Sequence, residues 1–248
     1  MKTVVCVKQV PDSETKVVIP EGGLWIDDSN VNYVLNPYDE YAVEEALRIQ
    51  EKLGGEIIIV SAGPGRAATA IRNALAMGAN SGVHIKDDNL RMGLSVAKIL
   101  AEAIKPLEPD LILLGKQAID DDNLQVGPMI AELLNLPSVS VVSKLEITEN
   151  GGTAERDIEG GKEVMEFSLP AVITAQKGLN EPRYASLKGI MMAKKKPMVE
   201  KQASDIPGGI TITKMEYPPK RQEGKTFKNG VEAVPEVVRL LREEAKAI

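Results

Sequence analysis

The chain has 248 residues, of which 43% are hydrophobic and 27% charged, and its formal net charge at pH 7 is −6. An acidic chain with 3% aromatic residues lacks the basic surface and stacking side chains of nucleic-acid-binding proteins. One cysteine and one histidine exclude an intrachain disulfide and a cysteine–histidine metal cluster. No signal sequence or membrane span precedes the first predicted strand, so we expect a cytoplasmic protein.

The first half of the chain alternates predicted strands and helices. Continuous apolar runs predict strands at residues 3–7, 56–60, 82–85 and 110–114, because such runs suit strands buried on both faces. A helix opens at Asn36, which can cap it with its side chain, and stops at Gly54. Further helices are predicted over 66–77, 92–104 and 126–134. This alternation predicts a Rossmann-like α/β fold, with a mostly parallel sheet and helices on both faces.

After Pro137 the pattern changes, and strands are predicted at 138–143, 144–148, 153–157, 164–168 and 171–175. We expect them to form an antiparallel or mixed extension, with a turn at Gly160-Gly161. The sequence pattern of strands and helices becomes weaker from about Gly189. A last helix with an apolar stripe is expected over 235–247. This tail is either a disordered linker or an arm that packs on a partner, and the apolar stripe favours the arm.

Two glycine-rich segments follow predicted strands. Residues 63–68 (GPGRAA) fit the pattern G-x-G-x-x-A, which is either a dinucleotide-binding turn or a tight turn for close helix–sheet packing. Its place after the second long strand, and the donor missing at Pro64, favour the packing turn.

The loop 115–127 leaves the carboxyl end of a strand, where open α/β sheets bind ligands. Gly115 would let the backbone approach a ligand, and Asp120–Asn123 can cap the helix that follows. The acids form either a solvated capping run or a magnesium site. If the helix N-terminus instead binds a phosphate through its backbone N–H groups, the acids must point away or cap.

No nucleophilic or acid–base constellation is evident, so we do not expect this chain alone to catalyse a reaction. His84 and Cys6 are interpreted as structural or pocket residues. The segment 180–187 (NEPRYASL) is either a surface turn with its leucine tucked inward or a protruding loop whose Leu187 fills a pocket on another protein. The lysines at 194–196 are a solvated run or steer a partner electrostatically.

Several segments together resemble the small (beta) subunit of electron-transfer flavoproteins, between about Val4 and Lys196. They are residues 5–12 (VCVKQVPD), 36–38 (NPY) with 42–46 (AVEEA), 74–79 (ALAMGA), 114–122 (LLGKQAIDD) and 180–187.

The resemblance implies a heterodimer whose large (alpha) subunit holds FAD, while this chain binds AMP. It implies domains over residues 1–190, which bind the nucleotide, and 191–248, an arm on the partner subunit. The matching cofactor-binding positions are Cys6, Asn36, Tyr38, Ala62, Gly63, Gly115, Gln117, Asp120, Asp121, Asp122, Asn123, Gln125 and Val126. Tyr38 matches a position near the partner's flavin, whereas Ser13 and Met192 depart from the family pattern.

The family's recognition loop corresponds to residues 180–192, with Leu187 as its anchor and Tyr184, Ile190 and Met191 beside it. The resemblance implies that this loop docks on flavin dehydrogenases such as acyl-CoA dehydrogenases of fatty acid β-oxidation. Electrons would pass to the FAD of the complex and on to a membrane quinone oxidoreductase. The chain would thus be an electron carrier subunit rather than an enzyme.

Two alternatives remain open. One branch of the family bifurcates electrons, oxidises NADH and binds a second FAD in place of AMP. Lys116, Asp121, Asn123 and an unaltered 180–184 segment favour the AMP branch. The other alternative is a nucleotide-binding regulator of the universal-stress type, which would need no flavin subunit.

Overall fold

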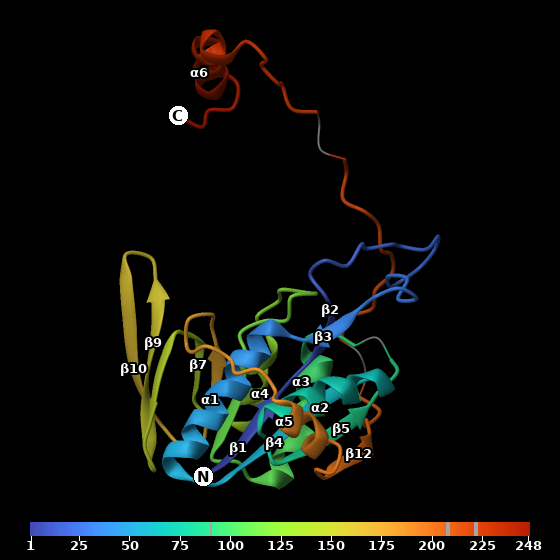
Figure 1. Ribbon diagram of the computed structural model, residues 1–248, viewed down its shortest axis with the longest axis vertical. Coiled ribbons are helices and arrows are strands. Elements are labelled where there is room, and N and C mark those ends of the chain that lie inside the picture. Colours follow the sequence, from blue (N-terminus) through green and yellow to red (C-terminus); the bar gives the residue numbers. More distant parts are fainter. Residues whose placement is uncertain (90, 207–208, 221–222) are drawn as a thin grey trace.

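A seven-stranded parallel sheet forms the centre of the computed structural model, which describes residues 1–89, 91–206, 209–220 and 223–248 (Figure 1). The strand order is β12-β5-β4-β1-β6-β11-β7, and each neighbouring pair is parallel. The strands are β1 (Lys2–Cys6), β4 (Glu56–Gly63), β5 (Ser81–Lys86), β6 (Leu111–Gly115), β7 (Ser138–Val142), β11 (Ala171–Ala175) and β12 (Met198–Gln202). The chain passes from β1 to β4 and β5 and returns to β6 on the other side of β1, so the winding direction reverses there.

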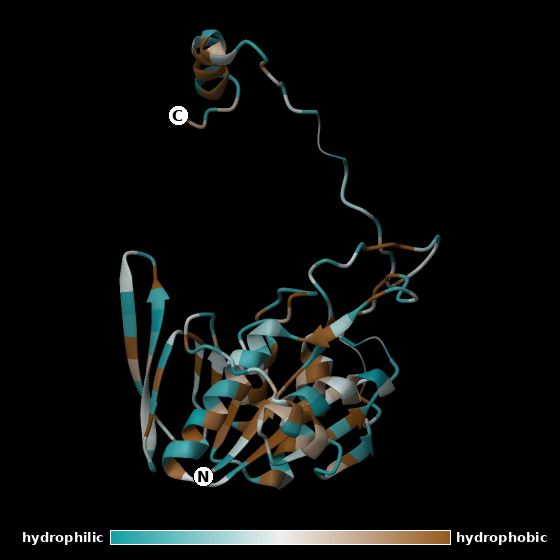
Figure 2. Ribbon diagram, in the orientation of Figure 1, coloured by the Kyte–Doolittle hydropathy of each residue, from teal (hydrophilic) through white to brown (hydrophobic). Residues whose placement is uncertain are grey.

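Helices cover both faces of this sheet, as predicted. One face packs against α1 (Pro37–Leu53), α2 (Ala68–Met77) and α5 (Leu187–Ala193), and the other packs against α3 (Leu94–Ile104) and α4 (Val126–Leu134). Successive β1 residues face opposite layers, since Val5 belongs to the first core and Val4 to the second. The apolar colouring of the central strands in Figure 2 matches their burial on both faces. The predicted α/β class is confirmed.

Helix α1 begins and ends where the sequence predicts. Pro37 opens it, Asp39 and Glu40 lie in its first turn, and Gly54 ends it at a φ of 70°. The predicted side-chain cap is wrong, however, because the Asn36 side chain accepts no hydrogen bond from the backbone N–H groups at the start of the helix. It bonds a distant loop instead.

Two small antiparallel sheets complete the body. β2 (Gln9–Pro11) pairs with β3 (Tyr33–Leu35), and β8 (Lys144–Ile147), β9 (Gly151–Ile158) and β10 (Gly161–Ser168) pair in the order β10-β9-β8. The β9–β10 hairpin stands beside the main sheet in Figure 1. The second half of the chain is therefore mixed, because β7 and β11 join the parallel sheet while β8–β10 form the antiparallel extension.

Helix α5 and strand β12 were not predicted, since the sequence pattern weakens after Gly189. Strand β12 adds a parallel edge to β5, so residues 198–202 belong to the main sheet rather than to a free tail. Most of its residues are exposed, including Glu200 and Lys201. An edge strand of this kind has little apolar signal because one side of its ladder faces solvent.

Beyond the main body the chain runs out to α6 (Val234–Glu243), which lies well away from the sheet (Figure 1). Helix α6 buries none of its residues. The preceding segment touches the body at Tyr217, whose hydroxyl accepts from the Ile19 N–H (2.9 Å) and donates to the Val17 carbonyl (3.2 Å). Short 3-10 turns lie at Gly65–Ala67, Lys105–Leu107 and Gly230–Ala233. In the described ranges, no helix has the length and apolarity to span a bilayer.

Candidate functional site

The candidate site lies where three parallel strands end at the reversal of the sheet. Cys6, the last residue of β1, pairs with Val60 of β4 and Leu114 of β6. Open α/β sheets bind ligands outside the carboxyl ends of their strands at such a point. The loop from Gly115 to α4 starts at this edge, and the first turn of α1 packs against it.

Asp39, in the first turn of α1, joins the ends of β1 and β6. One carboxylate oxygen accepts from the Lys8 backbone N–H (2.7 Å) and the other from the Gly115 N–H (2.9 Å). Burial raises the pKa of Asp39 to about 7, although both backbone bonds, the Asn36 side chain and the Lys8 charge act to lower it. A single carboxyl group therefore connects helix α1 to the chain that leaves β1 and to the end of β6.

Gly115 is required by this packing. A Cβ at this position would lie 2.5 Å from the Asp39 carboxylate and 2.6 Å from the Tyr38 Cβ, which is closer than real Cβ contacts. The close approach of helix α1 therefore accounts for glycine at this position, and the expectation that Gly115 lets the backbone approach a ligand stays a prediction.

Asn36 holds the first half of the 115–126 loop. Its Nδ2 donates to the Gln117 carbonyl (2.8 Å), and its Oδ1 accepts from the Ile119 N–H (3.2 Å). Asn36 is almost completely buried, so both bonds are sheltered from solvent. The amide thus connects the start of α1 to the loop.

The run of aspartates is bound to side chains of the protein itself. The Lys8 ammonium contacts Asp120 at 2.8 Å and Asp121 at 3.2 Å. The Asp122 carboxylate accepts from the Gln117 amide. Lys8 therefore offsets negative charge at a place where an anion would otherwise be repelled.

The predicted capping of α4 by these acids is wrong. The N-cap residue is Gln125, and no side chain caps the helix. The first N–H groups of α4 thus lack a side-chain acceptor, as expected of a helix end available to an anion. Within the part of the chain that the structure describes, no cluster of three histidine, cysteine or acidic side chains is arranged for a metal ion, so the magnesium alternative gains no support.

Two residues of this loop adopt left-handed backbone conformations. Asp122 has a φ of 49° and Leu124 a φ of 55°. Aspartate tolerates this region, but for leucine it costs about 1–2 kcal/mol. Strain of this kind persists where the surroundings enforce it, and it is frequent at ligand-binding loops.

The remaining predicted residues lie along the same edge. Ala62 and Gly63 are the last residues of β4 and pair with β5. In the G-x-G turn, a Cβ at Gly63 would lie 3.3 Å from the Ala67 Cβ, whereas one at Gly65 would meet nothing within 4 Å. Close helix packing therefore accounts for the first glycine only.

Neither of the two singled-out core residues is poised for chemistry. Cys6 is buried on the α3–α4 side, and burial, with the Asp39 charge second, raises the pKa of its thiol far above the ordinary range. His84 is fully buried in β5, with its Nε2 3.1 Å from the Gly63 carbonyl oxygen. Both positions agree with the structural interpretation.

The second candidate surface is the apolar segment, residues 184–192. Tyr184 is 99% exposed and Leu187 83%, and Ile190 and Met191 are also exposed. The alternative of a leucine tucked inward is therefore wrong. Leu187 is the first residue of α5, and Ser186 caps that helix by accepting from the Gly189 N–H (3.0 Å).

Sequence reasoning missed Lys8 and Asp39 as organisers of the site. The sequence pattern assigns neither Asp39 nor Lys8 a role in the site. Their signal in the sequence is positional, because Lys8 follows the first strand by two residues and Asp39 lies in the first turn of a helix that covers it. Their partners are far away in the chain, and no local pattern reveals them.

Comparison with known proteins gives one consistent result. Residues 23–206 match the family described as "Electron transfer flavoprotein domain". A protein of Bacillus subtilis named "Electron transfer flavoprotein subunit beta" is 43% identical over 260 residues, covering 100% of both chains. Proteins of the same name are 44% identical in Syntrophomonas wolfei, covering 90% of this chain and 88% of that protein, and 40% identical in Bos taurus, covering 98% and 97%.

Proposed function

The chain belongs to the electron transfer flavoprotein family as a beta subunit, and from this premise we propose that it binds AMP at the carboxyl edge of its sheet. The name beta subunit implies an alpha-subunit partner in a heterodimer, and the proteins of this family are electron carriers. The family membership decides against a regulator of the universal-stress type. The observation that carries the proposal is the loop 115–126, which Asn36, Asp39 and Lys8 hold beside the uncapped start of α4.

The phosphate of AMP would lie at the start of α4. Backbone N–H groups at Val126 and Gly127 would donate to it, and the helix dipole would favour its charge. Asp120 and Asp121 would not repel it strongly, because Lys8 contacts both carboxylates. The remaining predicted cofactor-binding positions, from Cys6 to Gln125, would form the wall of the pocket or support it.

Asp121 and Lys116, two residues by which the sequence departs from the bifurcating branch, are both held by contacts with other side chains. Asp121 is paired with Lys8, so it occupies space that a smaller residue would leave free for a larger ligand. The Lys116 ammonium lies 5.1 Å from the centre of the Tyr38 ring and keeps these two side chains together beside the loop. The bifurcating alternative remains the outcome that the test below would reveal.

The apolar segment would dock flavin dehydrogenases such as acyl-CoA dehydrogenases. Exposed apolar side chains such as Tyr184 and Leu187 gain most when they are buried in a partner's pocket. Docking would bring the donor flavin close to the FAD of the alpha subunit, and electrons would pass on to a membrane quinone oxidoreductase. In this scheme the chain supplies recognition and structure.

The C-terminal arm after β12 would pack on the alpha subunit. No residue in the described ranges buries the apolar side of helix α6, on which Val234 and Leu241 are exposed. An amphipathic helix of ten residues is marginal alone in water and gains stability by covering its apolar stripe.

Cofactor analysis of the purified heterodimer tests the AMP proposal. The complex is denatured, and the released nucleotides are counted by mass spectrometry against protein concentration. One FAD and one AMP per heterodimer are expected. Two FAD and no AMP would replace the proposal with the electron-bifurcating alternative.

A further inference from the structure

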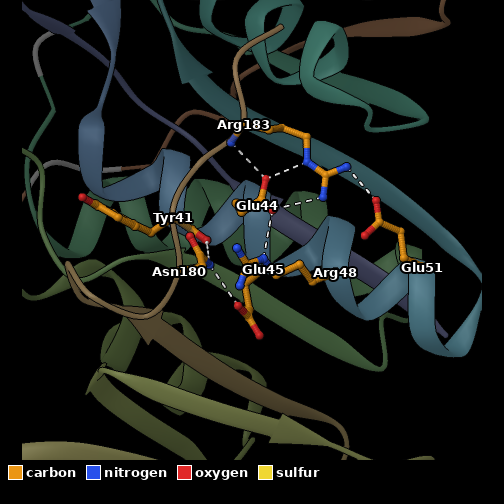
Figure 3. Close-up of polar contacts among 7 residues, drawn as sticks. All are labelled: Tyr41, Glu44, Glu45, Arg48, Glu51, Asn180 and Arg183. Atoms are coloured by element: carbon orange, nitrogen blue, oxygen red, sulfur yellow. Dashed lines mark hydrogen bonds and ion pairs between the residues drawn. The ribbon is translucent and has the colours of Figure 1, made fainter.

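The apolar segment is attached to the body by polar contacts at both of its ends, on two different helices. Before the segment, Arg183 and Asn180 bond to helix α1 (Figure 3). After it, Lys196 and the carbonyl of Ala193 bond to helix α2 and its C-terminal turn. Between these points, the large side chains from Tyr184 to Met192 face solvent.

The first attachment is centred on Glu44. The Arg183 guanidinium donates to both of its carboxylate oxygens, at 2.8 and 3.0 Å, and the Arg183 backbone N–H donates to it at 3.1 Å. The same guanidinium donates to Glu51 at 2.6 Å. Figure 3 shows Arg183 lying along α1 with Glu44 and Glu51 one after the other on the helix. This two-oxygen contact fixes the orientation of the guanidinium as well as its position.

Burial distinguishes the two acids. The Glu44 side chain is 3% exposed and that of Glu51 59%. Burial acts to raise the pKa of Glu44, but the bonds from Arg183 and Arg48 outweigh it and lower the pKa. The contact with Glu44 is thus sheltered from solvent, whereas the contact with Glu51 is screened and weak.

Asn180 reinforces this attachment. Its Nδ2 donates to the Tyr41 carbonyl (3.0 Å) and to Glu45 (2.9 Å), and the Asn180 side chain is itself buried.

The second attachment uses the C-terminal end of α2. The Lys196 ammonium donates to the carbonyls of Leu75, Gly78 and Ala79 at 2.9, 3.0 and 2.6 Å. Arg72 donates from α2 to the carbonyls of Ala193 and Lys196 at 2.6 and 2.8 Å. Lys196 therefore does not belong to a solvated run, since it satisfies all three of its donors on the last turn of a helix.

We propose that Arg183 and Lys196 are positioning residues, which hold the apolar segment in the shape that a dehydrogenase recognises. This inference rests on the proposed docking function of the segment. A loop fixed in advance loses less conformational entropy on binding, so the same exposed side chains give tighter association. Arg183 acts through α1 and Lys196 through α2, and neither residue needs to touch the partner.

Steady-state kinetics of the heterodimer test the role of Arg183. The electron donor is an acyl-CoA dehydrogenase that reduces the wild-type complex, and the concentration of the complex is varied. Arg183→Gln is expected to raise KM about tenfold with kcat nearly unchanged, because it removes charge-assisted bonds to a buried acid. Arg183→Lys keeps the charge but loses the two-oxygen contact, so its KM should lie between those of the wild type and Arg183→Gln. Glu51→Gln removes the exposed partner of the same guanidinium and should leave KM within about twofold.

A double substitution separates positioning from general damage. In a Leu187→Ala background the anchor is already absent, so Arg183→Gln should add less than about twofold to KM. If the KM of the double variant rises by the full product of the two single-variant increases, Arg183 does not act through Leu187 and the inference is wrong. If Leu187→Ala alone changes nothing, the proposed docking function fails instead. Hydrogen exchange in residues 184–192 should be faster in Arg183→Gln, with the core strands unchanged; equal exchange would also overturn the inference.

Lys196 is tested against Lys194, an exposed lysine two residues away. Lys196→Met should raise KM several-fold at every salt concentration, because it releases the end of the segment. Lys194→Met removes the same charge but leaves the end of the apolar segment attached. It should raise KM less, and this effect should disappear in high salt. Equal, salt-sensitive effects of both substitutions would assign the lysines to electrostatic steering and refute the positioning role of Lys196.

Discussion

Replacing Gly115 by alanine should damage both the fold and the proposed nucleotide site. The new Cβ would lie 2.5 Å from the Asp39 carboxylate, 2.6 Å from the Tyr38 Cβ and 2.7 Å from the Tyr38 carbonyl carbon. The Tyr38 carbonyl carbon belongs to the backbone, and the position of the Tyr38 Cβ is fixed by the backbone. No change of side-chain rotamer therefore relieves these two overlaps. The first turn of α1 must move away from β6.

The cost of this movement has two parts. Forcing an extra carbon into a packed site costs about 1–3 kcal/mol. Above pH 8, where Asp39 is ionised, loss of the bond from the Gly115 N–H to its carboxylate adds about 1.5–3 kcal/mol. Together these give roughly 2.5–6 kcal/mol, which corresponds to a fall in Tm of roughly 5–24 °C for a domain of this size.

Thermal unfolding of the heterodimer, combined with mass-spectrometric counting of AMP, measures both effects. Gly161→Ala is the matched control, because a Cβ there meets nothing within 4 Å and the residue is outside the left-handed region. Gly115→Ala should unfold at a lower temperature than the control and retain less AMP. A variant with unchanged Tm and full AMP content would refute the argument that α1 and β6 require glycine at their contact.

Three further predictions concern single side chains. Leu187→Ala should lower kcat/KM for reduction by an acyl-CoA dehydrogenase roughly 30-fold with FAD content unchanged, since a lost anchor costs about 2 kcal/mol or more; unchanged kinetics would exclude the anchor. Burial raises the pKa of Asp39 to about 7, so between pH 5 and 8 the folded chain releases a proton that the unfolded chain has already lost. Its contribution to stability should therefore fall by about 2–3 kcal/mol as pH rises through that window, and Asp39→Asn should lack this decline in pH-dependent urea unfolding. Asn36→Ala removes both side-chain bonds to the 115–126 loop and should weaken AMP retention about tenfold in dialysis, whereas a variant that keeps AMP fully would exclude that role.

The helices and strands that were predicted correctly are those whose signal lies in a few neighbouring residues of the sequence. The apolar run of β1, the start of α1 at Pro37 and the whole of α4 can be seen in a few neighbouring residues, because periodicity and helix-start signals act over short distances. For Leu187 the local pattern left two alternatives open, a leucine tucked inward and an exposed one, and only the structure decided for the exposed one.

The edge strand β12 shows where local pattern fails. Its residues are mostly polar and exposed, and it becomes a strand because β5 offers a free ladder edge to it. The capping prediction for Asn36 failed for a related reason, because the Gln117 carbonyl and the Ile119 N–H in a distant loop bond to the same amide.

The sequence alone determined the α/β class, the order of most elements and the two segments proposed to carry function. These follow from short-range patterns and from the resemblance that those segments bear to a family. Only the tertiary structure decided which groups meet. Lys8 and Asp120 are 112 positions apart, and Arg183 and Glu44 are 139 apart. Contacts over such separations exist only once the strands are in order and helix α1 is packed across them, so no spacing in the chain could have indicated them.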